Sequence, residues 1–243
     1  MKKLSVLVTM LAMMALASTS FANSYDYADA TDYNNTGVYA TTATWNRLGT
    51  TWTGEAGAWA VANDTDRDDG VSWSINNGAF AHNAITVGDH VKFQFILSKV
   101  EWGRHHADYL KVWINWNNED KDFTDPGEMV FATAYTFTPH IEADGSPTQF
   151  LNQVDHSATI VGTYYYEKTF SDISAGDYWL RARVVCNPDA GSLEAFSPTA
   201  AYTQGEIEDW KLTVNQRVPE PATLLLLGIG LLGLGGVRRK LRK

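Results

Sequence analysis

The side chains best suited to chemistry are rich in oxygen and are concentrated in residues 115–128. The carboxylate and amide groups that could act as metal ligands there are those of Asn117, Asp120, Asp122, Asp125 and Glu128. Calcium takes about six to eight oxygen ligands, and a tight acidic loop can supply several of them. The spacing is not that of an EF-hand, because Lys121 stands at the fifth position from Asn117 and no glycine follows it. The stretch predicts either a calcium loop of another kind or a solvated acidic hairpin held by Asx turns.

A second acidic group, Glu206 and Glu208, opens the last predicted strand. Alternation along a strand places both carboxylates on the same side as Trp210, which we expect to be buried. A buried carboxylate needs a partner, and a guanidinium can satisfy it through two hydrogen bonds. We expect Arg181 and Arg183 to form buried ion pairs with these two glutamates. The alternative is a calcium ion that Glu206 and Glu208 share with the acidic loop.

Trp113 is a candidate for sugar stacking. It lies on the opposite side of its predicted strand from Val112 and Ile114, which we expect to face the core. An exposed indole ring beside an acidic loop suits carbohydrate contact. The alternative is that the N-terminal part of the chain covers this ring.

Apolar and polar residues alternate in several stretches between the two ends of the chain. The clearest are residues 91–97, 110–116, 178–184 and 210–214. This period of two is typical of strands that bury one face, and no stretch between residues 23 and 218 has a sustained helical pattern. The sequence predicts an all-β fold, a two-sheet antiparallel β-sandwich over residues 70–217. A loop-rich segment, residues 23–69, is expected to pack on it.

The two ends of the chain have the composition of targeting segments. Residues 1–22 combine two lysines, an apolar stretch and a small-residue cleavage site, which predicts a signal peptide in a helix, removed by signal peptidase. Residues 218–243 combine Pro219-Glu220-Pro221, an uncharged apolar run over 222–237 and a basic end. As a helix this run would reach roughly 24 Å, short of the bilayer core of about 30 Å. It predicts a hydrophobic helix that anchors the protein in the membrane only transiently.

The charge of the chain between these ends disfavours nucleic acid as a partner. Residues 23–218 contain 12 basic and 27 acidic side chains, a net charge of about −15. Phosphate binding needs a basic patch, and residues 23–218 contain none. Cys186 is the only cysteine, so an internal disulfide is excluded and a buried thiol is expected. The six histidines do not have the spacing of a known zinc motif.

The C-terminal tail resembles the PEP-CTERM sorting signal of Gram-negative bacteria. The resemblance lies in Pro219, Glu220 and Pro221, in the glycine-rich apolar run and in the basic end. It implies that an exosortase cuts near this motif and that the protein passes to the cell surface or to an exopolysaccharide matrix. An ordinary single-pass anchor is the alternative.

Residues 205–210 resemble the Gly-Glu-Val-Glu-Asp-Tyr signature of the GEVED domain of bacterial exported proteins. Residues 113–128 resemble its Trp-Ile-Asp-Trp-Asn-x-Asp-Gly-Asp-Phe element, and residues 178–184 resemble its Arg-x-Arg strand. Asn115 replaces an aspartate of that pattern, and Lys121 replaces a glycine. The resemblance implies a β-sandwich of surface and secreted proteins, without an established catalytic role.

Together these observations favour an exported, non-enzymatic β-sandwich that acts as a structural or adhesion component of the surface or matrix. Calcium is the one cofactor that the sequence suggests, and exopolysaccharide is the candidate partner. The alternative function is that of a secreted carbohydrate-active enzyme or its accessory sugar-binding module.

Overall fold

The computed structural model describes residues 26–30, 33, 39–40, 46–51, 68–99, 107–117, 120–136, 159–218 and 229. The signal segment 1–22, the sorting motif Pro219-Glu220-Pro221 and nearly all of the C-terminal apolar run lie outside these residues. The two terminal helices predicted from the sequence are therefore not described. Within the described residues, no helix has both the length and the apolar character needed to cross a membrane.

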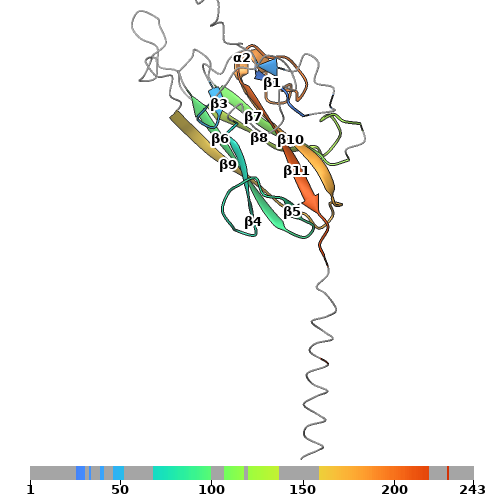
Figure 1. The fold of residues 1–243 in the computed structure, drawn as a ribbon. Helices are drawn as coiled ribbons and strands as arrows, with labels where there is room; N and C mark the ends of the chain where they lie inside the picture. Colours follow the sequence, from blue (N-terminus) through green and yellow to red (C-terminus); the bar gives the residue numbers. More distant parts are fainter. Residues whose placement is uncertain are drawn as a thin grey trace, which may run out of the picture.

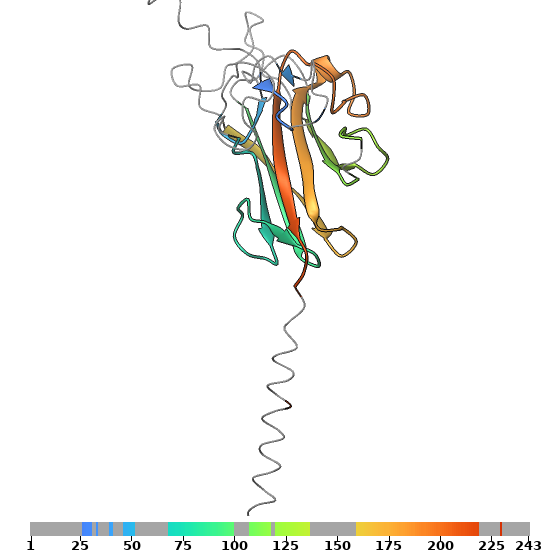
Figure 2. The same cartoon turned by 45° about the vertical axis from the view of Figure 1, so that its right-hand side comes forward.

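Two sheets form the body of the protein (Figures 1 and 2). The five-stranded sheet contains, in spatial order, β5 (Ile85–Thr86), β11 (Glu206–Asn215), β10 (Gly176–Cys186), β7 (Ala107–Asn115) and β8 (Met129–Thr136). The four-stranded sheet contains β3 (Asn46–Leu48), β4 (Val71–Ile75), β6 (His90–Lys99) and β9 (Thr159–Thr169). All strand pairs in these sheets are antiparallel except β5 with β11. The predicted all-β, two-sheet fold is confirmed.

β6 is the central strand of the four-stranded sheet. It pairs with β9 along its whole length, so β3 and β4 share its other edge, one after the other. β3 lies in the segment 23–69 that the sequence predicted to be loop-rich. At three residues it is too short for alternation to reveal it, yet it extends the sheet to residues before position 70.

Smaller elements lie at the end of the sandwich where β11 begins (Figures 1 and 2). β1 (Asp26–Tyr27) and β2 (Tyr39–Ala40) form a two-stranded sheet, and α2 (Asn187–Ala190) is a single turn directly after β10. β1 and β2 both contact β11. The start of β11 is therefore surrounded by segments from distant parts of the sequence.

The main core lies between the sheets and consists of the alternating apolar residues. From β6 it includes Val91, Phe93, Phe95 and Leu97, all fully buried, and these face Leu180 and its inward neighbours on β10. Each such side chain contributes roughly 1.5–3 kcal/mol through burial. The core fixes which residues of each strand point inward and which point outward.

The register of β10 with β11 decides how the charged residues are distributed. Ala182 lies opposite Glu208, whereas Arg181 lies opposite Asp209. Directly opposed residues of an antiparallel pair share a face, and successive residues alternate between faces. Glu208 therefore points toward the other sheet, and Arg181 and Asp209 point to the outer face of the five-stranded sheet.

Candidate functional site

Glu206 and Glu208 bind backbone amides of the opposite sheet. Glu208 accepts hydrogen bonds from the N–H groups of Gly70 at 2.7 Å and Val71 at 2.9 Å, and from the indole of Trp210 at 3.1 Å. Glu206 accepts one from the N–H of Leu48 at the end of β3. Both carboxylates are buried. They fasten the end of β3 and the start of β4 to β11, so both carboxylates are already occupied by hydrogen-bond donors of the protein.

Gly205 and residues 206–209 form the acidic motif at the start of β11. Backbone geometry requires the glycine at its first position. Its φ is 126°, and a Cβ placed on it would lie 2.0 Å from the carbonyl oxygen of Val184. Only glycine fits there without moving β10. The glycine lets β11 enter the sheet close to β10, so that the two glutamates that follow can reach the opposite sheet.

Asp209 completes the motif on the outer face. Arg181 donates to it through Nε at 2.8 Å and Nη2 at 2.7 Å, and the side chains of both residues are almost fully buried. The N–H groups of Asp29 and Ala30 also donate to Asp209, each at 2.8 Å. This arrangement joins the N-terminal segment to the sheet through a bidentate ion pair.

The predicted ion pairs of Arg181 and Arg183 with Glu206 and Glu208 are therefore wrong. The two arginines lie on the outer face and the two glutamates on the inner face, because residue numbers of opposite parity alternate across the sheet. Arg183 donates through Nη1 to the carbonyl groups of Ser197 and Ala200, each at 2.9 Å. Its guanidinium lies over the ring of Tyr202. Asp209 lies directly opposite Arg181 in the pairing of β10 with β11, so the register of these two strands would have identified it as the partner.

Trp113 is covered and cannot serve as a sugar platform in this structure. It is 3% exposed and belongs to a small outer-face cluster with Ala30, Tyr33, Phe123 and Trp179. The alternative prediction, that the N-terminal part of the chain covers it, describes what is observed. Phe123 comes from the acidic loop, and its ring centroid lies 4.5 Å from the guanidinium carbon of Arg181. The acidic loop thus packs beside the motif.

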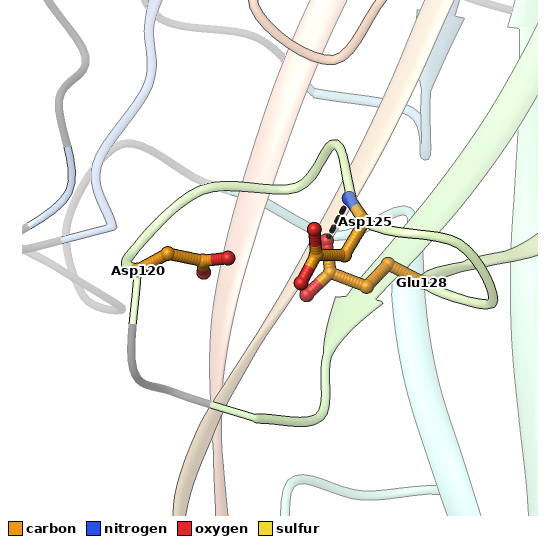
Figure 3. A group of neighbouring side chains, drawn as sticks. All are labelled: Asp120, Asp125 and Glu128. Carbon is orange, nitrogen blue, oxygen red and sulfur yellow. Dashed lines mark hydrogen bonds between the residues drawn. The ribbon is translucent and has the colours of Figure 1, made fainter.

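Three carboxylates of this loop converge. Asp120, Asp125 and Glu128 offer oxygen atoms that lie within 4.8 Å of one another (Figure 3). Of the described residues, these three are the group of His, Cys, Asp and Glu side chains with the geometry to share one metal ion. Glu206 and Glu208 are not part of it, so the prediction of an ion shared between the two acidic groups is wrong.

The other predicted ligands of the loop have local roles. Asp122 accepts hydrogen bonds from the N–H and hydroxyl groups of Thr124 at 2.8 Å and 3.0 Å, which is an Asx turn. Asn117 donates from Nδ2 to Asp125 at 2.6 Å and so orients that carboxylate. Lys121 has a φ of 55°, in the left-handed region that glycine adopts without strain.

The environment of Glu128 disfavours its charged form. Burial, together with the charges of Asp120 and Asp125, raises the pKa of Glu128 to about 7, although a hydrogen bond from the Asp125 N–H opposes the shift. The Asp120 carboxylate, through its hydrogen bond and its charge, raises the pKa of Asp125 as well. A cation in this group would offset the repulsion between carboxylates that contributes to both shifts.

Two further groups have structural roles. Burial raises the pKa of the Cys186 thiol to about 12, and its sulfur donates to the side chain of Gln204 at 2.9 Å, which argues against a nucleophile. Lys99 and Asp108 form a fully buried ion pair between the end of β6 and the start of β7. Sequence reasoning missed this pair, because neither residue stands out within its strand.

Comparison with protein families identifies two regions. Residues 109–213 match the GEVED domain, and residues 217–240 match the PEP-CTERM protein-sorting motif. Both resemblances found in the sequence are confirmed. The first match runs from within β7 to within β11, and it includes the acidic loop and the Glu206–Asp209 motif. The second begins two residues after β11 ends.

Other comparisons add little. No protein of curated function is significantly similar to the chain. The CARDB domain of the PF1109 protein from Pyrococcus furiosus, in complex with di-metal ions, is 9% identical with a TM-score of 0.31, over 61% of this chain and 93% of that one. The C-terminal domain of wzt is 11% identical with a TM-score of 0.30, over 72% of this chain and 78% of that one. Similarity this distant says nothing about ligands.

Proposed function

Since the chain is an exported, exosortase-processed protein with a GEVED domain, we propose that its β-sandwich is a non-catalytic structural or adhesion module of the cell surface or exopolysaccharide matrix. Exosortase acts on the C-terminal motif, and the domain before it remains outside the cell. Exopolysaccharide is the partner that this location favours.

The observation that carries the proposal is how the motif carboxylates are used. Glu206, Glu208 and Asp209 are all buried and accept hydrogen bonds from backbone amides, from an indole or from Arg181. A general acid or nucleophile must instead present its carboxylate to a substrate. The most distinctive residues of the domain therefore support its architecture.

One exposed surface favours the accessory sugar-binding module as the second candidate. Phe80 and Tyr165 are 39% and 45% exposed, and their ring centroids lie 6.1 Å apart. The hydroxyl of Tyr165 accepts a hydrogen bond from Gln94 at 3.3 Å. Exposed aromatic rings beside amide and charged groups suit contact with a neutral sugar.

Calorimetry with the exopolysaccharide of the source bacterium, beside a hydrolysis assay on the same material, tests the proposal. We expect no release of reducing ends. Turnover would overturn the non-catalytic proposal. Binding that is lost in Tyr165→Ala but kept in the matched variant Tyr109→Phe would favour the sugar-binding module.

Cell fractionation tests the location. In a strain without exosortase we expect the uncut protein to collect in the membrane fraction, whereas the parent strain should contain the shortened form at the surface or in the matrix. Equal distribution of one unprocessed form in both strains would contradict the proposal.

A further inference from the structure

The acidic loop contains a buried polar atom that the proposed structural or adhesion role does not explain. Glu128 is 3% exposed, and its Oε1 atom is buried and has no hydrogen-bond partner. The other oxygen, Oε2, accepts the N–H of Asp125 at 3.0 Å (Figure 3). A buried carboxylate oxygen without a donor is costly, and no described residue of the chain supplies a donor to this atom.

The hydroxyl of Tyr33 is a second, independent sign of a missing ligand. Tyr33 is 5% exposed, and its oxygen is also buried without a hydrogen-bond partner. Its ring packs on Phe123 of the acidic loop, with 4.9 Å between ring centroids. Burial and then the charges of Glu128, Asp209 and Asp120 raise the pKa of its hydroxyl. The phenol therefore lies within the electrostatic reach of the loop carboxylates.

We propose that Asp120, Asp125 and Glu128 bind one calcium ion, and that this ion, with its bound water, also holds the Tyr33 hydroxyl and so secures the N-terminal segment to the sandwich. Three carboxylates with oxygens within 4.8 Å of one another form an oxygen-only set, which suits a hard cation. Asn117 orients Asp125 from outside the group, and water completes the coordination.

The site lies directly beside the outer-face part of the motif. Arg181 contacts Phe123 of the loop on one side and Asp209 on the other, and Asp209 holds Asp29 and Ala30. The ion would complete a second attachment for the same N-terminal segment. One attachment uses protein donors alone, and the other depends on the calcium concentration.

Calorimetric titration of calcium into the chelator-treated full chain tests this proposal. We expect one saturable site with a dissociation constant of about 0.1–1 mM, the range of extracellular modules. Asp120→Asn should weaken binding about tenfold or more without unfolding the protein, because Asp120 is at the surface. The matched control is Asp172→Asn, which removes an exposed carboxylate elsewhere and should leave binding unchanged. Equal loss in both variants, or no heat of binding, would overturn the site.

The attachment of the N-terminal segment has its own readout. Calcium should slow hydrogen exchange at the amides of Asp29 and Ala30 in the wild-type chain. In Tyr33→Phe, which keeps the ring packing, the protection should be smaller although calcium still binds. If calcium binds but exchange at these amides does not change, the attachment part of the proposal is wrong. Neither result bears on export or on polysaccharide binding.

Discussion

The two acidic regions of this protein differ in how their charges are satisfied. In the motif at the start of β11, the buried carboxylates accept hydrogen bonds from amides, an indole and a guanidinium supplied by other parts of the chain. In the loop before β8, the carboxylates face one another, and the Oε1 atom of Glu128 has no donor. A cluster of acidic residues therefore indicates a function only when the hydrogen-bond donors around it are known. The motif holds β3, β4 and the N-terminal segment against β11, whereas the loop has the composition of a cation site.

The largest expected effect comes from breaking the buried ion pair of the motif. Arg181→Ala leaves the Asp209 charge buried without its guanidinium, so we expect a loss of about 3–5 kcal/mol in the free energy of unfolding. Urea denaturation measures it. The matched control is Lys211→Ala, which breaks the half-exposed pair with Asp177 and should cost at most about 1 kcal/mol. Equal losses in the two variants would remove the distinction between buried and surface pairs.

Glu208→Gln is expected to have the next largest effect. Gly70 and Val71 donate to different oxygens of Glu208, so a glutamine in the same position would place its NH₂ group against one of these two N–H groups. We expect a loss of about 2–4 kcal/mol and faster hydrogen exchange at these two amides. Glu167→Gln, at a surface pair with Lys92, is the control. Unchanged exchange at Gly70 and Val71 would mean that Glu208 does not hold the start of β4.

The third prediction concerns the acidic loop and the way in which the stability of the protein depends on pH when a chelator is present. The pKa of Glu128 is about 7 in the folded protein and about 4.3 in the unfolded chain. The folded state therefore holds this proton more tightly. Its contribution to stability is fully present below about pH 4.3 and is lost as the pH rises through about 7.

The variant Glu128→Gln has no such proton to lose. Wild type should therefore lose stability relative to the variant between about pH 4.3 and pH 7, as thermal unfolding at a series of pH values would measure. A constant difference between the two proteins over this range would show that Glu128 titrates normally.

The smallest expected effect is that of Lys121→Gly. Glycine relieves the strain of a positive φ, but it also gains freedom in the unfolded chain, so the net change in stability should be within about 0.5 kcal/mol. Loss of the positive charge should tighten calcium binding by about two- to threefold. Lys121→Ala removes the charge but keeps a Cβ at the same positive φ, so it should tighten binding equally and leave stability close to that of the wild type. No change in affinity in either variant would show that this charge does not act on the site.

The strands and their inward faces could be predicted from the sequence, because alternation in β6, β7, β10 and β11 follows directly from burial of one face. The hydrogen-bond partners of the motif carboxylates could not be predicted from the sequence. Leu48 and Glu206 are separated by 158 residues, and nothing in either local pattern indicates their contact. Nor does the local pattern around Trp113 indicate that Ala30 and Tyr33 of the N-terminal segment pack in the same cluster. The Arg181–Asp209 pair is an intermediate case, since it required only the register of two adjacent strands.

The position of the sorting motif has a mechanical consequence. β11 runs the length of the sandwich and ends at Asn215, four residues before Pro219 (Figure 1). A pull applied at that end would be directed along β11 and would load its ladder with β10 in shear, so that many hydrogen bonds resist together. At the far end of the strand, Glu206, Glu208 and Asp209 would pass the load to β3, β4 and the N-terminal segment.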